Sequence, residues 1–237
     1  MVTMAINLNN MVKLSQILSV ILLLVGCDRA DEQLPTPYDN PEVSLNIPVG
    51  FPEFNSSVKN NKPTKYGVKL GERLFNEKKF SGNNTISCKS CHNQAYAFTD
   101  KKAKAVGIFN RVGLRNTPAI QNMAFMKFYN WDGNILELEN QPLVPIITHE
   151  EMNSSIVEVI GNLKLDQEYS ELFFKAFGDS EITADRIYKS IAQYAYTLVS
   201  ANSKYDRVKR NEGEKFTRSE SRGYAVFQIK CAMCHSG

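Results

Sequence analysis

The sequence predicts an all-α protein with two lobes, and three observations support that fold class. Apolar residues recur every three or four positions in several stretches that begin with a helix-capping residue. A Cys-x-x-Cys-His motif occurs twice, once in the first half of the chain and once near its last residue. No stretch shows the alternation of a strand series, and no internal repeat is visible. We expect one helical lobe around each motif.

Cys-x-x-Cys-His is the attachment motif of c-type haem. Its two thiols can add to the vinyl groups of the porphyrin, and the adjoining imidazole is then held beneath the iron as the proximal ligand. The chain has five cysteines and three histidines, so two complete motifs account for most of them. We expect two covalently bound c-type haems, with His92 and His235 as iron ligands. The motif residues are Cys88, Cys91 and His92, and Cys231, Cys234 and His235.

The residues alone leave other uses of paired cysteines open. A zinc ribbon separates its pairs by about 15–20 residues, whereas Cys91 and Cys231 are much farther apart. Disulfides would suit an exported protein but would not explain the histidine after each pair. A thioredoxin-like redox pair needs a βαβ context, which this sequence does not show. Haem is the interpretation that accounts for both histidines.

The start of the chain is typical of an export signal. Lys13 precedes an apolar run over residues 17–25, which is short for a bilayer span. The run ends in Leu-Val-Gly-Cys, which resembles the lipobox of bacterial lipoproteins, although an ordinary signal peptide is an alternative. We expect residues 1–27 to be a lipoprotein-type signal peptide and a lipidated Cys27 to anchor the protein to a membrane. Residues 28–54, rich in proline, asparagine and acidic side chains, should form a tether.

Four helices are expected where apolar spacing follows a capping residue. Thr64 begins the first, Asp166 begins the second, which ends at Gly178, and Thr183 begins the third. The fourth covers about residues 221–229 and leads into the second motif. The side chains expected on the buried faces of the first three helices are Leu70, Leu74, Phe75, Tyr169, Leu172, Phe173, Ala176, Ile187, Ile191, Tyr194, Ala195 and Leu198.

Several short motifs, in the same order, resemble those of the bacterial di-haem cytochrome c peroxidases, a family that includes the maturation enzyme of methylamine utilisation. The resemblance runs from about residue 47 to residue 237. It implies two cytochrome c-like haem lobes and a bacterial enzyme of the periplasm or outer cell envelope. The matching motifs are LGERLF at 70–75, FSG at 80–82, the first haem motif, AFTD at 97–100, RNTP at 115–118 and WDGN at 131–134.

The resemblance also implies an activity and site residues. The family reduces hydrogen peroxide to water at its first haem, with electrons from a small cytochrome c or a cupredoxin. By motif and spacing, Glu151 matches the acid–base group and Gln141 the residue that orients peroxide, although a shift of one position would select Glu150. Trp131, the only tryptophan, matches a residue proposed to relay electrons between the haems; a core role is the alternative.

Other positions follow from the same resemblance. Many members have a distal histidine on the loop after the first motif, but Ile108 stands at that position, so we expect a first haem with an open distal face. Asn116 matches a ligand of a calcium ion at the domain interface. Arg111 and Arg115 could pair with haem propionates, or they could be solvated loop residues. His149 is expected at the surface or at the edge of the pocket.

We expect residues 55–200 to form the first, peroxidatic haem domain with the interdomain helices. Residues 201–237 should begin a second haem domain, which is expected to be truncated because the family's second domain continues well past this motif. An oxidase of the methylamine-utilisation maturation type and a non-catalytic electron-transfer cytochrome remain alternative functions. The net charge of +3 is too small to favour nucleic-acid binding.

Overall fold

The computed structural model describes residues 38–235, and within them the regular structure is helical, which confirms the predicted fold class. Isolated antiparallel bridges replace sheets in this part of the chain. The α-helices are α2 (Ser56–Asn60), α3 (Lys65–Phe75), α4 (Cys88–Cys91), α5 (Leu143–Ile147), α6 (Ile156–Lys164), α7 (Gln167–Phe177), α8 (Ala184–Tyr196), α9 (Lys204–Lys209), α10 (Arg218–Lys230) and α11 (Ala232–His235). The 3₁₀ helices are η1 (Lys78–Phe80), η2 (Gln94–Tyr96), η3 (Ile108–Asn110), η4 (Met123–Phe125) and η5 (Leu138–Asn140).

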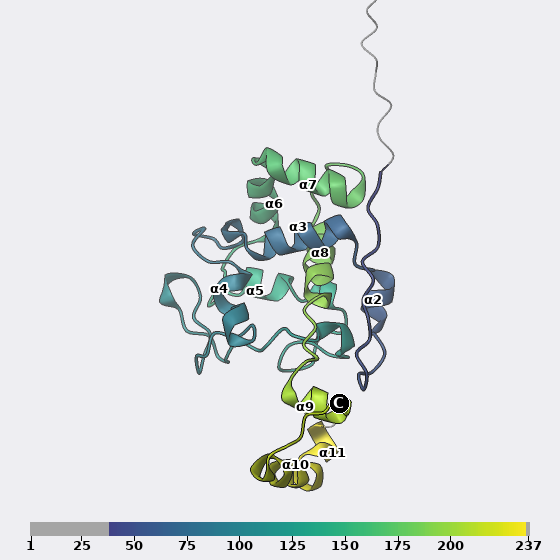
Figure 1. Cartoon of the computed structure of the whole chain (residues 1–237). Coiled ribbons are helices and arrows are strands. Elements are labelled where there is room, and N and C mark those ends of the chain that lie inside the picture. The colour runs from purple at the N-terminus through teal and green to yellow at the C-terminus, as the bar shows by residue number, and fades with distance from the viewer. Residues whose placement is uncertain (1–37, 236–237) are drawn as a thin grey trace, which may run out of the picture. The chain divides into compact units, whose positions relative to one another are not determined.

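Helices α3 and α8 form the centre of the fold and cross each other at close range (Figure 1). Their closest approach depends on Gly71, because a Cβ at that position would overlap the backbone carbonyl of Ser190 on α8. Helix α7 packs on α3, and α6 packs in turn on α7. Helices α3, α7 and α8 therefore share one core.

The capping residues predicted for these helices are confirmed. The Thr64 hydroxyl accepts a hydrogen bond from Gly67 N at 3.2 Å, and Asp166 and Thr183 cap α7 and α8 in the same way. Gly178 ends α7 in the left-handed conformation with φ 87°, which glycine adopts without strain. Nine of the twelve expected core side chains are buried. Leu172, Tyr194 and Leu198 are half-buried, and Leu198 lies beyond the end of α8.

Six of the ten α-helices in the described residues were not predicted from the sequence, and α5 and α6 are two of them. Helix α6 has a complete capping box, in which Ser155 and Glu158 each bind the other's backbone N–H. Helix α5 has one buried side chain, Ile146. The last predicted helix exists but is longer, because Thr217 caps α10 with its own capping box and moves its start to Arg218.

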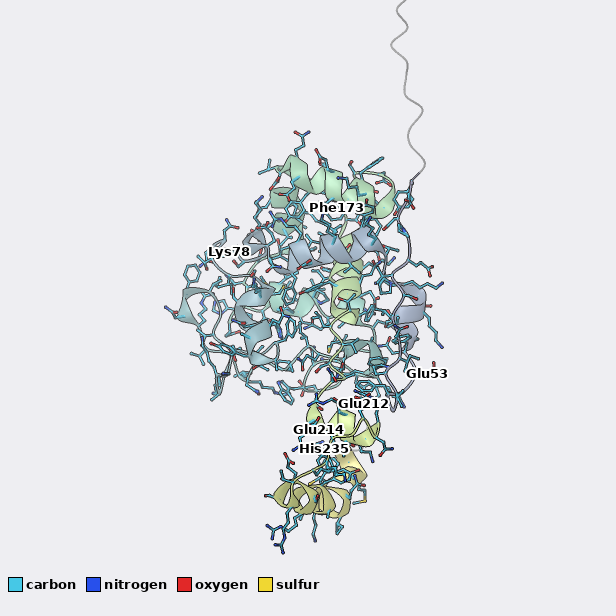
Figure 2. The ribbon with its side chains drawn as sticks, viewed as in Figure 1. Glu53, Lys78, Phe173, Glu212, Glu214 and His235 are labelled. Atoms are coloured by element: carbon cyan, nitrogen blue, oxygen red, sulfur yellow. The ribbon has the colours of Figure 1, made fainter. Side chains whose placement is uncertain are left out.

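Buried side chains form two clusters. The first gathers around α3, α6, α7 and α8, and Phe173 of α7 (labelled in Figure 2) is fully buried in it. The second includes Val58, Tyr129 and Tyr196, which come from α2, the central loops and the end of α8. Residues from both clusters line the same cavity, so the cavity lies between them.

The C-terminal segment, residues 203–235, comprises α9, α10 and α11 and includes Glu212, Glu214 and His235 (Figure 2). It is held together by contacts within itself: Arg207 pairs with Glu214, and Lys204 pairs with Glu220 at 2.7 Å. Tyr205, Phe216 and Tyr224 form a ring cluster. No residue of α9, α10 or α11 is buried.

The signal peptide, Cys27 and the first part of the expected tether lie outside residues 38–235. Within the described range, no helix has both the length and the apolar character needed to cross a bilayer. The expected domain boundaries at residues 54 and 200 stay predictions.

Candidate haem site

A cavity of about 710 Å³ lies next to the first Cys-x-x-Cys-His motif. Its volume is in the range of pockets that hold cofactors and other small molecules. The walls are mainly apolar and include Phe80, Ile146 and Leu138 from the two core clusters. A cavity of this shape and lining can exclude water from a flat, largely apolar group.

The first motif is placed by a very short helix. Ser87 precedes α4; its N–H donates to the Ser90 hydroxyl at 3.0 Å, and the Ser90 N–H donates to the Ser87 carbonyl at 2.9 Å. This turn brings Cys88, Cys91 and His92 to the same cavity. The two-residue spacing of the cysteines therefore places both thiols and the imidazole at one site.

The orientation of His92 is fixed by a backbone carbonyl. Its Nδ1 lies 3.0 Å from the carbonyl oxygen of Phe98, so Nδ1 carries the proton and Nε2 is left unprotonated. Ala97 and Phe98 both adopt positive φ values, 56° and 58°, and this left-handed turn directs the carbonyl to the ring. Burial lowers the pKa of His92, which favours the neutral imidazole that binds a metal.

The motif cysteines are free thiols that border the cavity. Burial raises the pKa of Cys88 to about 12 and also raises that of Cys91, so both are uncharged near neutral pH. Two thiols and an imidazole, all bordering an apolar cavity, are the groups that covalent haem requires. The residues present therefore fit a c-type haem.

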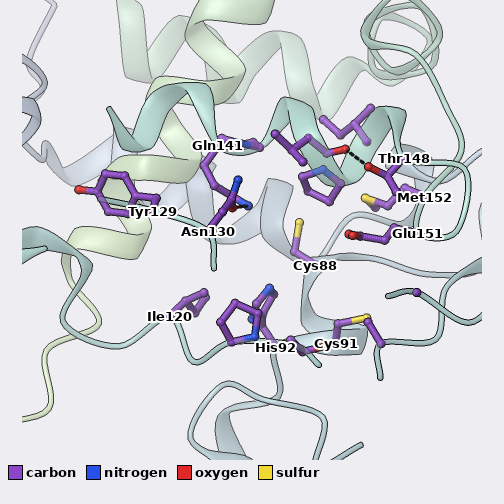
Figure 3. A pocket seen from close by; sticks show the side chains of 18 of the residues that line it. Cys88, Cys91, His92, Ile120, Tyr129, Asn130, Gln141, Thr148, Glu151 and Met152 are labelled. Atoms are coloured by element: carbon purple, nitrogen blue, oxygen red, sulfur yellow. Dashed lines mark hydrogen bonds between the residues drawn. The ribbon is translucent and has the colours of Figure 1, made fainter. Parts of the chain in front are cut away.

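Gln141 and Glu151 lie on the side of the cavity opposite His92 (Figure 3). Gln141 follows η5, and its amide nitrogen is 3.3 Å from the side-chain oxygen of Asn130. Burial, and then the neighbouring charge of Glu150, raises the pKa of Glu151. The arrangement places an amide and a carboxyl of raised pKa across the cavity from the imidazole. Glu150 lines the cavity as well, and its carboxylate accepts from His149 Nδ1 at 3.3 Å.

Trp131 and Asn116 meet at the edge of the cavity. Trp131 is 56% exposed, and its indole N–H donates to the backbone carbonyl of Asn116 at 2.9 Å. Both line the cavity. Within residues 38–235, no group of three or more His, Cys, Asp or Glu side chains could hold a metal ion. Calcium at Asn116 and electron relay through Trp131 stay predictions.

In the loop between the first motif and Trp131, two arginines are bound to other groups and one isoleucine is buried. Arg115 pairs with Asp132 at 2.7 Å, and Arg111 donates to the backbone carbonyl of His149 at 3.0 Å. Ile108 is buried and does not line the cavity. His149 is exposed, as expected. The chain between His92 and His149 contains no histidine, so this loop offers no imidazole to the side of the cavity opposite His92.

The second motif has different surroundings. Cys231, Cys234 and His235 are all exposed, and none of them lines the cavity beside the first motif. Cys231 ends α10, and the other two lie on α11. The structure therefore does not bring the two motifs together at one site.

Sequence reasoning missed two residues of the site. The Phe98 carbonyl holds His92, and the Asn130 side chain holds Gln141. Asn130 has a positive φ of 62°, which asparagine tolerates better than most residues, so its type was a usable signal. No residue-type signal identifies the carbonyl of a phenylalanine.

The chain is similar to known proteins of one family. A family model described as "Di-haem cytochrome c peroxidase" matches residues 65–214. Methylamine utilization protein MauG of Methylorubrum extorquens is 36% identical over 189 residues, which are 78% of this chain and 53% of that protein. Cytochrome c551 peroxidase of Nitrosomonas europaea is 35% identical over 174 residues, 72% of this chain and 51% of that protein.

A solved structure has the same fold. It is described as a MauG-like protein associated with microbial copper homeostasis, and it superimposes with a TM-score of 0.74 at 30% identity. The match covers 81% of this chain and 58% of that one. The chain spans about half the length of the curated relatives that it matches.

Proposed function

Because the chain belongs to the di-haem cytochrome c peroxidase family, we propose that it reduces hydrogen peroxide to water with electrons from a small cytochrome c or cupredoxin. Membership implies two c-type haems. The proposal places the protein in the periplasm or outer envelope, with a lipidated Cys27 as its anchor. The observation that carries it is the position of Gln141 and Glu151 across the cavity from His92.

The first haem would be held by residues of the motif. Cys88 and Cys91 would form the two thioether bonds, and His92 Nε2 would bind the iron, since Nδ1 is engaged by Phe98. When bound, the haem supplies a redox-active iron beside the substrate. The apolar walls exclude bulk water, which strengthens every polar contact made inside the cavity.

Glu151 would transfer the proton that peroxide cleavage needs. In this proposal its carboxylate takes the proton from one peroxide oxygen and returns it to the other, which leaves as water. Its raised pKa suits a group that must both accept and release a proton. The Gln141 amide, held by Asn130, would orient the peroxide by hydrogen bonding. Trp131 would pass electrons from the second haem, bound at Cys231, Cys234 and His235.

Replacing Glu151 tests the proposal directly. In protein matured with haem, we expect Glu151→Gln to reduce peroxide turnover by about 10²- to 10⁴-fold, the usual contribution of a general acid–base group. Glu150→Gln is the matched control, because it removes the adjacent carboxylate and should retain most turnover. Full activity of Glu151→Gln, or a larger loss in Glu150→Gln, would contradict the assignment.

One observation favours a second candidate, an oxidase of the methylamine-utilisation maturation type. No histidine occurs between His92 and His149, so the distal face lacks the imidazole that many peroxidases carry. MauG proteins and peroxidases also match the chain at similar identity. Oxidation of a reduced small cytochrome c in the presence of peroxide separates the two functions. A peroxidase oxidises the cytochrome over many turnovers, whereas an oxidase of that type oxidises it only slowly.

A further inference from the structure

The turn that carries Glu151, residues 148–153 and called the carboxylate turn below, is held through its backbone. The N–H of Glu151 donates to the carbonyl of Thr148 at 3.0 Å, within the turn itself. The carbonyl oxygen of Glu151 accepts from the N–H of Ile108 at 2.9 Å. Both backbone polar groups of Glu151 are therefore engaged, and one of the two partners lies more than forty residues earlier in the chain.

Ile108 belongs to a hairpin, residues 105–115, called the wall hairpin because several of its residues line the cavity. Its arms are joined by hydrogen bonds such as Gly107 N to Arg111 O at 2.9 Å. The Ile108 side chain is only 1% exposed, so it fixes the hairpin to the protein. A buried anchor next to the bond to Glu151 keeps the hairpin at a constant distance from the carboxylate turn.

Gly107 sets how closely the hairpin approaches that turn. A Cβ at Gly107 would overlap the carbonyl oxygens of Glu150 and Glu151, and backbone atoms cannot rotate away as a side chain can. Gly161 on α6 provides a contrast, because a Cβ there would meet no atom within 4 Å. Glycine is thus required by packing at Gly107 and not at Gly161.

Two more contacts hold the neighbouring residues of the turn. Arg111 of the wall hairpin donates through Nη1 to the carbonyl of His149 at 3.0 Å. On another side, Gly82 N donates to the carbonyl of Met152 at 2.9 Å, and a Cβ on Gly82 would overlap the carbonyl oxygen of Asn153. The carboxylate turn is therefore fixed between two separate segments of the chain.

We propose that the wall hairpin, through Gly107, Ile108 and Arg111, is a positioning element that sets where the Glu151 carboxyl lies in the cavity. The inference deepens the proposed function and rests on it, because it concerns the group assigned to proton transfer. A misplacement of about 1 Å at such a group can cost about 10²-fold in rate. The backbone of this hairpin therefore contributes to catalysis without touching substrate.

The charges around Glu151 allow its titration to report its position. Glu150 is the neighbouring group that acts on its pKa, besides burial. Arg111 faces the turn and binds a backbone carbonyl, and His149 pairs with Glu150. Asp100 and Glu151 both raise the pKa of Cys91, and Asp100 is not among the causes of the Glu151 shift. If the turn moves outward, Glu151 gains water and its pKa falls toward the ordinary value.

The test compares Gly107→Ala with Gly161→Ala in the haem-loaded protein. The carboxyl band of Glu151 is titrated by infrared spectroscopy and identified by its loss in Glu151→Gln. We expect Gly107→Ala to lower the titration midpoint by about half a pH unit or more and peroxide turnover by about tenfold or more. Gly161→Ala, on α6 away from the cavity, should match the parent in both measurements.

The outcomes separate this inference from the proposed function. A folded Gly107→Ala protein with the parent's midpoint overturns the inference. If that variant does not fold, Ile108→Val decides: it loosens the buried anchor of the hairpin without changing any charge, and we expect a smaller fall of the midpoint, whereas an unchanged midpoint overturns the inference. Full peroxide turnover in Glu151→Gln would overturn the proposed function, while the infrared midpoint would still report whether the hairpin places the carboxyl.

Discussion

The two Cys-x-x-Cys-His motifs have the same chemistry and opposite surroundings. At residues 88–92 the motif borders a cavity whose walls come from two buried clusters, and His92 is oriented by the Phe98 carbonyl. At residues 231–235 the cysteines and the histidine are exposed, on helices without a buried side chain. The five-residue motif can supply attachment and one iron ligand in both places. The second coordination position and the exclusion of water depend on other elements, which the structure shows only around the first motif.

The largest expected difference between the two motifs is in stability. The double variant Cys88→Ser/Cys91→Ser should lose the haem from a cavity of about 710 Å³ and leave its core side chains facing water. We expect the melting temperature of the main transition to fall by about 10 °C or more, since roughly 1 kcal/mol corresponds to 2–4 °C in a chain of this size. Circular dichroism measures the transition.

The paired variant is Cys231→Ser/Cys234→Ser, which should change the same melting temperature by less than about 2 °C, because its residues support no buried cluster. A haem stain of the denatured protein checks that each variant has lost one covalent haem. Equal falls in both double variants would show that the second motif supports the core as much as the first.

The pKa values of two carboxyl groups, Glu151 at the cavity and Glu220 in the C-terminal segment, are shifted in opposite directions. Burial and Glu150 raise the pKa of Glu151, whereas hydrogen bonds from Lys204 and Thr217 lower the pKa of Glu220 to about 2. Since the proposed reaction uses the Glu151 carboxylate, the acid limb of turnover should lie above pH 4.5, the ordinary pKa of glutamate. Glu150→Gln removes one cause of the shift, so the limb should move to lower pH. The measurement is the pH profile of peroxide turnover; a limb that does not move contradicts this.

The same comparison can be made with two tyrosine hydroxyl groups, one in the buried core and one in the C-terminal segment. The buried Tyr169 hydroxyl donates to the Glu77 carboxylate at 2.6 Å, whereas Tyr224 in the C-terminal segment bonds to an exposed lysine. Tyr169→Phe should cost about 2 kcal/mol and lower the melting temperature by about 4–8 °C. Tyr224→Phe should leave the main transition where it is. Thermal melts of the two variants give the comparison, which fails if both shift equally.

The smallest expected effect concerns helix caps. Thr183 caps α8 through Arg186 N at 3.3 Å, and Thr217 caps α10 through Glu220 N at 3.3 Å. Thr183→Ala should cost about 1 kcal/mol, or about 2–4 °C, because α8 belongs to the core. Thr217→Ala should affect local helicity without moving the main transition. Hydrogen exchange of α10 detects the local change, and a shifted main transition would contradict it.

The helices that could be predicted are those with both a cap and a spaced apolar face. The N-termini of α3, α7 and α8 were predicted correctly from Thr64, Asp166 and Thr183. In each case a capping side chain is followed by a segment with helical apolar spacing. Helix α6 had the same signal, in Ser155 and Glu158, and was missed. Its three-residue spacing is typical of a capping box and could have identified it.

The walls of the cavity were not predictable in the same way. Between the first motif and α5 the chain forms short 3₁₀ turns, and Ala97, Phe98 and Phe109 have positive φ values. Local preference disfavours that conformation for side chains of this kind, so contacts with the rest of the protein decide it. The cysteines and His92 could be identified because covalent haem attachment fixes their spacing. The contact between Ile108 and Glu151 joins segments that no local pattern relates.

The position of the single tryptophan gives the site an optical reporter. Trp131 stands at the cavity's edge, 56% exposed, with its indole N–H bound to the Asn116 carbonyl. A haem in the cavity would quench the indole by energy transfer, so ultraviolet-excited fluorescence should be strong in apoprotein and weak after haem incorporation. Because no other tryptophan contributes, the emission intensity would report haem incorporation during maturation, even in variants that have no turnover.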